Sequence, residues 1–481
     1  MDPPPRPPSG GAVSSYGDHG GLSKTEGRLE DADLLIRDGR VVRRGRGLSS
    51  RTAKVVDVSG AFIFPAFVDL HTHIREPGAR GSEDMESACK AAVLGGYGAV
   101  VAMPNTEPPI DSREAARAFL GRARSLGLCH VEVAGCITER RRGARLAPLA
   151  TMAHEGVRIF TDDGSYLLDS FLMRSALKWA RALGVVIADH PEESFLVTEG
   201  TGNRSFGGLG SGAGAVSGRS GGDESPAVGS GHDWGSGVAN EGSLSGCLGL
   251  GGRPREAEEV AVSRDLVLCR STLGRLHLMH LSVAESVGLV RRAKEAGAPV
   301  SCEVTPHHLC FTEDVLVNLD PVYKVNPPLR TKADTEALLE GLADGTIDAI
   351  ATDHAPHAPE LKELPFAEAP PGIAGLEVAA SICYEVLVAS GALGPIRFSE
   401  VMSAAPAAIA GLDTSLGFGL PLLEGSPAHI TVFDPSRLWQ FDPQVAATKA
   451  KLSPYAGRKL SGKVTHTFVG GVHLVEEGEL V

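Results

Sequence analysis

The sequence predicts an α/β fold: a (β/α)8 barrel (TIM barrel) with a small β-sandwich domain formed from both chain ends. Eight short apolar runs with the character of strands recur through the middle of the chain, and helix-like segments separate most of them. This alternation favours parallel strands that close into a barrel under a layer of helices. Short strand-like runs also occur near both termini, and neither set is large enough to be stable alone. We therefore expect the two ends of the chain to pair.

Length and composition are typical of a large globular protein. The chain has 481 residues, 42% hydrophobic and 22% charged, so it can bury a large core and a second small domain. Its net charge of −13 argues against binding to nucleic acid or to an anionic membrane. The eight cysteines include no Cys-x-x-Cys pair, which indicates buried thiols in a reducing compartment. Because no apolar run approaches the ~20 residues of a membrane span, and no signal segment is evident, we expect a cytoplasmic location.

The N-terminal part begins with a tail and continues with short strands. Residues 1–28 are rich in Pro, Gly and Ser, and we expect them to be disordered. Residues 33–42 have the pattern of a hairpin with an Asp-Gly turn, and residues 54–58 have that of another strand.

Strand-like runs near the C-terminus offer partners for these short strands. They are residues 428–433, 464–469 and 472–475. We therefore predict a composite β-sandwich domain from residues 29–65 and 413–481, and a barrel from residues 66–412.

The strands of the barrel are predicted from their apolar character and length. They are residues 66–71, 98–103, 130–136, 156–161, 185–190, 275–280, 299–304 and 347–352. Between them, residues 170–183 and 283–296 place apolar residues at helical spacing. The alternative is a doubly wound sheet, but no Gly-x-Gly-x-x-Gly motif follows an early strand.

One segment interrupts the alternation. Residues 200–237 are more than one-third Gly and have almost no apolar periodicity, so we predict a flexible insertion. It follows the fifth strand and would hang from the catalytic face. An inert insertion is favoured over a lid or a partner-binding segment.

The first barrel strand ends in a motif that could bind metal. His71 and His73 are two residues apart, so in a strand both imidazoles point to the same side. Arg75 is again two residues further on, which would place a cation beside a metal ion and suggests a carboxylated substrate. An isolated His-x-His is equally compatible with an ordinary strand that carries surface histidines.

Distant strand ends supply further candidate ligands. The predicted strands four, five, six and eight end near Asp162 and Asp163, His190, His280, and Asp353, respectively. In a barrel all of these would meet on one rim. Four histidines and two aspartates exceed the needs of one tetrahedral zinc and suit two ions bridged by a carboxylate. The pattern predicts metal-assisted hydrolysis of a polar carbonyl compound, with Asp353 taking and returning a proton.

Other histidines favour structural roles. His277 is an odd number of residues from His280 and should face the opposite side of the strand. His307 and His308 are expected to support the site rather than form it, and His354 to hydrogen-bond within its own loop.

Several motifs, in one order, resemble those of the class I dihydroorotases of the amidohydrolase superfamily over roughly residues 30–480. They are FVDLHTHIREPG at 67–78, AMPNTEPP at 102–109, FTDDG at 160–164, EVTPHHL at 303–309, KVNPPLR at 324–330, ATDHAPH at 351–357 and APPGIAGLE at 369–377. The sequence departs from the family at Pro191, where Cys is more usual, and in the Gly-rich insertion.

The resemblance implies a role for each candidate ligand. His71, His73 and Asp353 would hold the first Zn²⁺, His190 and His280 the second, and Asp163 would bridge the two ions of each subunit. Asp162 is the adjacent alternative for the bridge. Asp353 would also be the catalytic base and acid, and a bridging hydroxide the nucleophile.

The resemblance also implies a substrate and its contacts. The reaction would be the reversible ring opening of (S)-dihydroorotate to N-carbamoyl-L-aspartate in pyrimidine biosynthesis. The residues expected to bind the substrate are His73, Arg75, Asn105, Asn326, His357, Pro371 and Gly372. A homodimer and an association with aspartate transcarbamoylase are the implied protein contacts.

Two rival functions follow from the same superfamily. Hydantoinases, dihydropyrimidinases and allantoinases typically bridge their metals with a carbamylated lysine near the fourth strand, where this chain has Arg158 and two aspartates. A non-catalytic scaffold for aspartate transcarbamoylase would be expected to have lost metal ligands, and none of the six is missing.

Overall fold

The computed structural model describes residues 11–13, 22–25, 28–197 and 238–481. The Gly-rich insertion and most of the predicted tail therefore lie outside the described residues. Two stretches of the predicted tail differ from that expectation, because β1 (Gly11–Val13) and β2 (Leu22–Thr25) are strands. β1 pairs with the first strand of the hairpin and with β6 (Lys54–Val56), and β2 pairs with β3 (Arg28–Asp31).

Eight parallel strands form the closed barrel that the sequence predicts. They are β8 (Phe67–Thr72), β9 (Tyr97–Ala102), β10 (His130–Val133), β11 (Ile159–Phe160), β12 (Val186–Asp189), β15 (Arg275–Leu278), β16 (Val300–Val304) and β17 (Ala349–Ile350). Successive strands pair side by side. Bridges from Gly135 to Phe160 and from Thr72 to His354 join the two arcs and close the ring.

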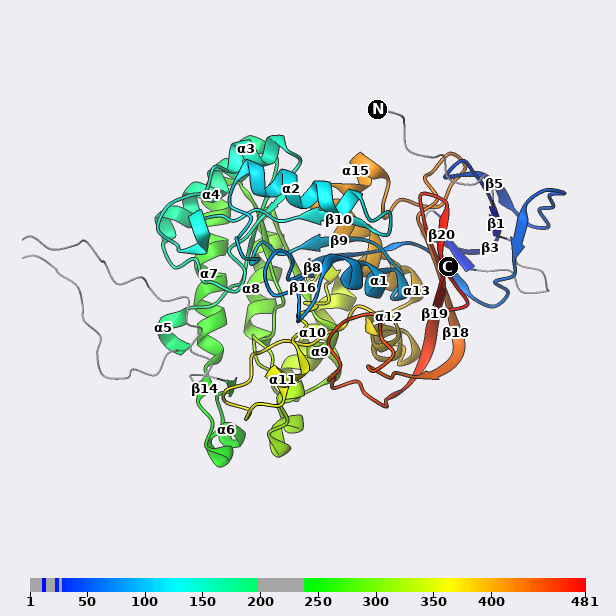
Figure 1. Cartoon of the computed structure of the whole chain (residues 1–481). Coiled ribbons are helices and arrows are strands. Elements are labelled where there is room, and N and C mark those ends of the chain that lie inside the picture. The colour runs from blue at the N-terminus through cyan, green and yellow to red at the C-terminus, as the bar shows by residue number, and fades with distance from the viewer. Residues whose placement is uncertain (1–10, 14–21, 26–27, 198–237) are drawn as a thin grey trace, which may run out of the picture.

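Helices surround the barrel on its outer side (Figure 1). The α-helices are α1 (Met85–Leu94), α2 (Arg113–Arg124), α3 (Leu149–His154), α4 (Ser170–Leu183), α5 (Ser194–Val197), α6 (Ser243–Leu248), α7 (Arg255–Thr272), α8 (Ala284–Glu295), α9 (Pro306–Cys310), α10 (Lys332–Asp344), α11 (Pro359–Lys362), α12 (Ala379–Cys383), α13 (Pro395–Ser399), α14 (Ala405–Ala410) and α15 (Leu412–Leu416). The helices predicted from periodicity at residues 170–183 and 283–296 are α4 and α8. Among the described helices, none combines the length and apolar character needed to cross a bilayer.

Shorter helical and extended elements complete the barrel domain. The 3-10 turns are η1 (Glu139–Arg141), η2 (Glu313–Asn318) and η3 (Pro321–Tyr323), and the π-helical turns are η4 (Tyr384–Ala389) and η5 (Glu400–Ala404). A two-stranded pair consists of β13 (Ala239–Asn240) and β14 (Gly252–Arg253).

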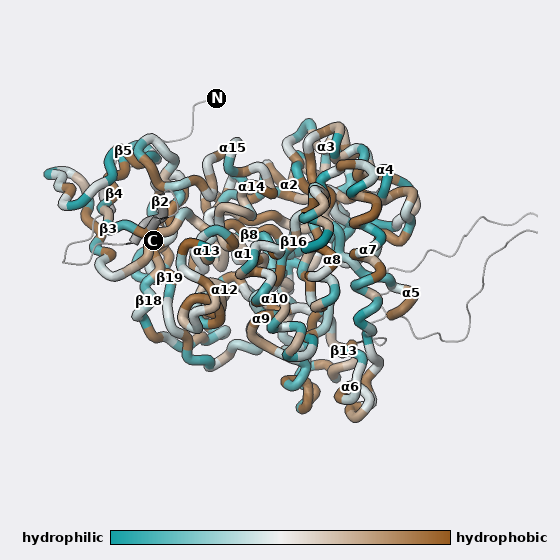
Figure 2. The backbone as a smooth tube through the Cα atoms, turned by 180° about the vertical axis from the view of Figure 1, so that it is seen from behind, coloured by the Kyte–Doolittle hydropathy of each residue, from teal (hydrophilic) through white to brown (hydrophobic). Residues whose placement is uncertain are grey.

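The barrel strands have two different apolar faces because side chains alternate along a strand. Small and medium side chains such as Val68, Ala99 and Ala188 form the interior core, whereas larger ones such as Phe67 and Phe160 pack under the helices. The tube in Figure 2 shows apolar residues concentrated along these central strands. This double burial explains why the strands are apolar runs and not alternating patterns.

The two ends of the chain meet in one β-domain beside the barrel (Figure 1). Its larger sheet has the order β21-β20-β19-β18-β7-β2-β3, and its smaller sheet the order β5-β4-β1-β6. The strands not yet bounded are β4 (Asp33–Arg37), β5 (Arg40–Gly45), β7 (Phe62–Pro65), β18 (Ile430–Gln440), β19 (Lys459–Val469), β20 (Val472–Glu476) and β21 (Glu479–Leu480). The predicted Asp-Gly turn joins β4 to β5, with φ of 49° at Asp38 and 76° at Gly39.

Candidate metal centre and active site

The candidate ligands all follow or end strands at the carboxyl rim of the barrel. His71 lies within β8 and His73 just beyond it, while Asp163, His190 and His280 follow β11, β12 and β15. Asp353 follows β17, and backbone hydrogen bonds join His73 N to His354 O (2.8 Å) and His354 N to His71 O (3.3 Å). The ring closure between the first and last strands thus brings Asp353 to the two histidines.

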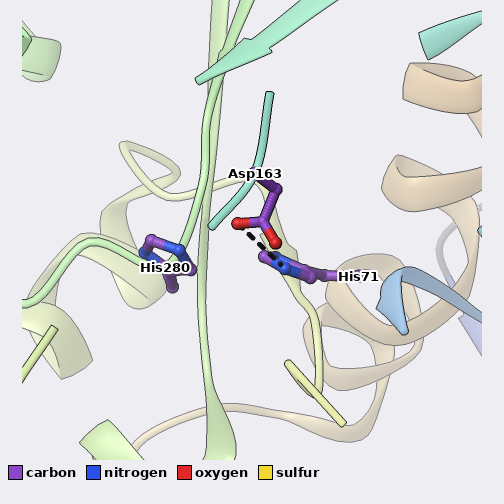
Figure 3. A group of neighbouring side chains, drawn as sticks. All are labelled: His71, Asp163 and His280. Carbon is purple, nitrogen blue, oxygen red and sulfur yellow. Dashed lines mark ion pairs between the residues drawn. The ribbon is translucent and has the colours of Figure 1, made fainter. Parts of the chain in front are cut away.

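Asp163 lies at the centre of this cluster. Its carboxylate oxygens are 3.6 Å from His71 Nε2, 3.5 Å from His73 Nε2 and 3.5 Å from His190 Nδ1. Figure 3 shows the carboxylate between His71 and His280, which come from strands far apart in the sequence. Ligand atoms of His71, Asp163 and His280 lie within 4.8 Å of one another, a spacing suited to one metal ion.

A second group of potential ligands shares His71. Asp353 Oδ1 lies 3.1 Å from His73 Nε2 and 3.5 Å from His71 Nε2, and ligand atoms of these three residues also fit within 4.8 Å. Two overlapping groups with Asp163 between them are compatible with a pair of adjacent ions.

Asp162, the alternative bridge, is engaged elsewhere. Its carboxylate accepts hydrogen bonds from the backbone N–H groups of Ile137 (2.9 Å) and Thr138 (3.0 Å) and from the Thr138 hydroxyl. It therefore anchors the loop after β10, whereas its neighbour faces the histidines. This geometry favours Asp163 as the bridging carboxylate.

The donor set fits a divalent cation. His71 Nε2 and His280 Nδ1 are buried and have no hydrogen-bond partner among the described residues. The unpartnered His71 nitrogen faces the carboxylates of Asp163 and Asp353, an arrangement that a positive charge between them stabilises. Neutral imidazoles and carboxylates are ligands that Zn²⁺ accepts.

The electrostatics of the cluster indicate the same need for positive charge. Burial disfavours the charged form of His71, but Asp163 and Asp353 outweigh it and raise its pKa well above the ordinary value. Burial likewise opposes ionisation of Asp163, yet the neighbouring histidines hold its pKa well below the usual range. Burial, with His190 and His71 nearby, lowers the pKa of His280 to about 3, so this ring is neutral.

Backbone conformation re-aims three of the site residues. Arg75, His280 and Asp353 have positive φ values of 61°, 34° and 43°, which non-glycine residues rarely adopt. Residues held in such conformations are concentrated at functional sites. Because the turn at His280 ends the strand alternation, this ring reaches the metal cluster from a position that would otherwise face the helices.

Arg75 and Asn105 provide hydrogen-bond donors beside the cluster. Arg75 Nε donates to Pro356 O (3.4 Å), and within the described part of the chain no hydrogen bond involves its two terminal nitrogens. The Asn105 side chain contacts His73 Nδ1 (3.0 Å) and donates to Asp163 (3.4 Å). A guanidinium with free terminal N–H groups can bind a carboxylate in a bidentate manner.

The remaining predicted substrate-binding residues lie in the segments that follow β16 and β17. Asn326 Nδ2 donates to Tyr166 Oη (3.2 Å) and lies 3.4 Å from His190 Nε2. His357 Nε2 donates to Pro371 O (2.8 Å). At Gly372, φ is 145°, and an added Cβ would be only 2.5 Å from Ala355 O, so a side chain does not fit there.

Two histidines were predicted incorrectly. His277 does not face away from the site: its Nε2 lies 2.9 Å from Glu303 Oε2 inside the barrel. The His354 side chain bonds outside its own loop, because its Nε2 contacts Glu83 (3.2 Å) and its Nδ1 accepts from Gly375 N (3.2 Å).

Sequence reasoning missed two groups that contact the ligands. Glu303 Oε1 lies 3.2 Å from His71 Nδ1, and its position on the inner face of an apolar strand could have revealed it. Glu192 lies 3.6 Å from His190 Nε2 and is held by Arg253, at 2.8 Å. Arg253 comes from the far side of the insertion, so no local pattern connects it to the site.

An α/β barrel with a histidine and aspartate cluster on its carboxyl rim defines a metal-dependent hydrolase of the amidohydrolase type. The model of the dihydro-orotase-like family matches residues 60–208, and that of the amidohydrolase family matches residues 232–474. A dihydroorotase of Streptomyces coelicolor is 40% identical over 94% of this chain and 96% of its own length. One of Mycobacterium tuberculosis is 39% identical over 94% and 97%, respectively. The chain belongs to the dihydroorotase family of amidohydrolases.

Solved structures share the architecture at lower identity. The L-hydantoinase (dihydropyrimidinase) of Arthrobacter aurescens aligns with a TM-score of 0.79, covering 98% of this chain and 97% of its own, at 23% identity. A dihydropyrimidinase from Brevibacillus agri aligns with a TM-score of 0.77 at 21% identity. These similarities concern the fold alone.

Proposed function

We propose that this chain catalyses the reversible hydrolysis of the cyclic amide of (S)-dihydroorotate to N-carbamoyl-L-aspartate, a step of pyrimidine biosynthesis. The observation that carries the proposal is the position of Arg75, with unused terminal N–H groups, beside a buried cluster of carboxylates and histidines. A cation there favours a ring that bears a carboxylate. Membership of the dihydroorotase family supports the same substrate.

The proposed cofactor is Zn²⁺, with two ions per subunit. His71, His73 and Asp353 would hold one ion, His190 and His280 the other, and Asp163 would bridge them. The group of His71, His73 and Asp353, the group of His71, Asp163 and His280, and the unpartnered nitrogens of His71 and His280 support a metal site here. His190 joins the cluster through Asp163, at 3.5 Å. A bound divalent ion polarises a carbonyl group and lowers the pKa of a coordinated water.

In the proposed mechanism, the protein positions the ring and moves one proton. Arg75 and Asn105 hold the substrate carboxylate, while Asn326, His357 and the backbone at residues 371–372 contact the ring. Asp353 accepts the proton of the attacking water. The oxygen of that water bonds to the ring carbonyl carbon, the carbon–nitrogen bond breaks, and Asp353 returns the proton to the leaving nitrogen.

A cyclic amidase for neutral rings is the second candidate, since the superfamily resemblance of the sequence motifs also includes such enzymes. In this chain Arg158 precedes β11, and aspartates follow it where those enzymes typically carry a bridging lysine. A cationic Arg75 also offers no advantage to a neutral hydantoin. A non-catalytic scaffold is disfavoured because all six expected ligands meet at one rim.

A substrate-panel assay tests the proposal. Purified chain loaded with Zn²⁺ should interconvert dihydroorotate and carbamoyl aspartate, and a chelator should abolish the activity. Hydantoin, dihydrouracil and allantoin should be turned over far more slowly. Preferential turnover of any of these neutral rings would contradict the proposed substrate.

The proposal also covers the location of the protein and its protein partners. We propose a cytoplasmic location, which is supported by the eight cysteines, all of them described and all free thiols. A homodimer and an association with aspartate transcarbamoylase remain predictions. Light scattering of the chain alone, and then with that enzyme, would test both.

A further inference from the structure

A row of hydrogen-bonded polar side chains lies in the barrel interior beneath the cluster of candidate metal ligands. Glu303 is fully buried on β16, with Oε1 3.2 Å from His71 Nδ1 and Oε2 2.9 Å from His277 Nε2. His277 Nδ1 is in turn 2.8 Å from the Ser301 hydroxyl. The row of side chains therefore runs from Ser301 through His277 and Glu303 to His71.

The Glu303 carboxylate determines which groups donate and which accept hydrogen bonds along this row of side chains. An ionised carboxylate only accepts hydrogen bonds, so the ring nitrogens that face Glu303 both carry hydrogen. His277 then accepts from the Ser301 hydroxyl at its other nitrogen. In the neutral form of His71, the form that binds a metal ion, hydrogen on Nδ1 leaves a lone pair on Nε2, the atom that faces Asp163 and Asp353.

This arrangement is distinctive among the candidate ligands. The far nitrogen of His73 contacts the neutral side chain of Asn105, and that of His190 is 3.6 Å from Glu192, beyond hydrogen-bonding distance. Of the four histidines, His71 has the shortest contact with a carboxylate on the side away from the cluster, 3.2 Å to Glu303 against 3.6 Å from His190 to Glu192. His71 is also the histidine shared by both ligand groups.

The surroundings give no structural reason for a carboxylate at this position. The interior core around it is built from aliphatic side chains such as Val68, Leu70 and Met279. Burial of a carboxylate is unfavourable unless its oxygens are hydrogen-bonded, and here both are used on histidines. An aliphatic residue could fill the same space in the barrel interior, but it could not orient the imidazole of His71.

We propose that Glu303, held by His277 and Ser301, is a positioning residue that keeps His71 in the tautomer and orientation required to bind the divalent ion. This role deepens the proposed function and rests on its metal site. Carboxylates hydrogen-bonded to ligating histidines fix the ring and increase its basicity, and their loss typically weakens metal binding on the order of 10- to 100-fold.

The test measures metal affinity directly, by competition between the protein and a chromophoric chelator for Zn²⁺. Glu303→Gln should bind Zn²⁺ about 10- to 100-fold more weakly than the wild type. His277→Gln should weaken binding less, since Glu303 keeps its contact with His71, and Ser301→Ala should weaken it least. This graded loss of affinity is expected if the three side chains act on His71 in series.

A matched control separates positioning from stability. Asp334 is also a fully buried carboxylate, but it caps α10 and pairs with Arg255 (2.7 Å), away from the cluster. Asp334→Asn should lower the melting temperature of the metal-free protein and leave the dissociation constant of Zn²⁺ unchanged. An unchanged dissociation constant in Glu303→Gln would overturn the proposal.

Three further outcomes would each be decisive. If Glu303→Gln does not fold, wild-type affinity in both His277→Gln and Ser301→Ala overturns the proposal. A wild-type chain that binds no divalent ion overturns the metal site and this role together. Tight metal binding without turnover of dihydroorotate contradicts only the proposed substrate.

Discussion

At the scale of single residues, Asp353 has the geometry of a proton acceptor that also contacts the metal ligands. Despite its burial, His71 and His73 hold its pKa below the usual range, so it is ionised at neutral pH. Asp353→Asn should lower kcat by roughly 10²- to 10⁴-fold, the usual contribution of general acid–base catalysis, with a much smaller change in KM. Steady-state kinetics with metal content measured in parallel checks this. An unaltered kcat would remove Asp353 from the proton transfer.

The neighbouring aspartates of the FTDDG motif should behave differently. Asp163→Asn should impair Zn²⁺ binding, because its carboxylate faces three histidines. Asp162→Asn should mainly destabilise the fold by about 1–3 kcal/mol, since it weakens the acceptor for the loop after β10. Metal titration and thermal unfolding of both variants distinguish these effects. The reverse pattern would assign the bridge to Asp162.

At the scale of elements, the loop that contains α11 holds a buried lysine. Lys362 Nζ donates to Pro321 O (3.0 Å) and Lys324 O (3.3 Å), and the charged groups that act on it are Lys324 and Asp320. Burial, with Lys324 nearby, lowers its pKa from 10.5 to about 7. Between these values the unfolded chain binds more protons, so this lysine makes the free energy of unfolding rise with pH from about 7 towards 10.

Replacing Lys362 should remove its contribution to the increase in the free energy of unfolding with pH. We expect the free energies of unfolding of Lys362→Met and the wild type, measured by denaturant unfolding from pH 6 to 10, to converge as the pH increases. Lys332→Met is the control, because the Lys332 side chain is 82% exposed, and its difference from the wild type should stay constant. A constant difference for Lys362→Met as well would contradict the depressed pKa.

The elements show what the sequence could and could not reveal. The barrel strands were predictable because burial on both faces makes most of them apolar runs, such as β8 and β9. The directions of His280 and His277 were not, since a positive φ at His280 ends the alternation on which the prediction relied. The register of β8 also shifts between Asp69 and Thr72. Such local irregularities re-aim side chains but leave no mark on the apolar pattern.

The candidate ligands were easier to place from the sequence than the side chains that contact them. His71, His73, Asp163, His190, His280 and Asp353 follow apolar runs, so the barrel topology alone brings them to one rim. The contact from Glu303 to His71 joins strands that are not neighbours in the barrel. It depends on side-chain length and direction across the interior, which a single sequence does not specify.

At the scale of the whole molecule, the β-domain and the barrel share a core. Phe64 on β7 is 1% exposed, and its ring lies 5.9 Å from that of Phe67 on β8 and 5.7 Å from that of Phe398 on α13. Phe64→Ala should destabilise the protein by about 3–5 kcal/mol. Phe195→Ala, at a side chain 67% exposed, should change stability by less than about 0.5 kcal/mol. Denaturant unfolding checks both, and similar effects would contradict a shared core.

The central claim is that a metal-dependent barrel selects a ring bearing a carboxylate through Arg75. Dihydroorotate and dihydrouracil differ by that carboxylate alone, so the ratio of their kcat/KM values isolates its contribution. The wild-type chain should strongly favour dihydroorotate, and Arg75→Ala should lose most of this preference, chiefly through a higher KM for dihydroorotate. An equal ratio in the two proteins, or a wild-type preference for dihydrouracil, would contradict the account.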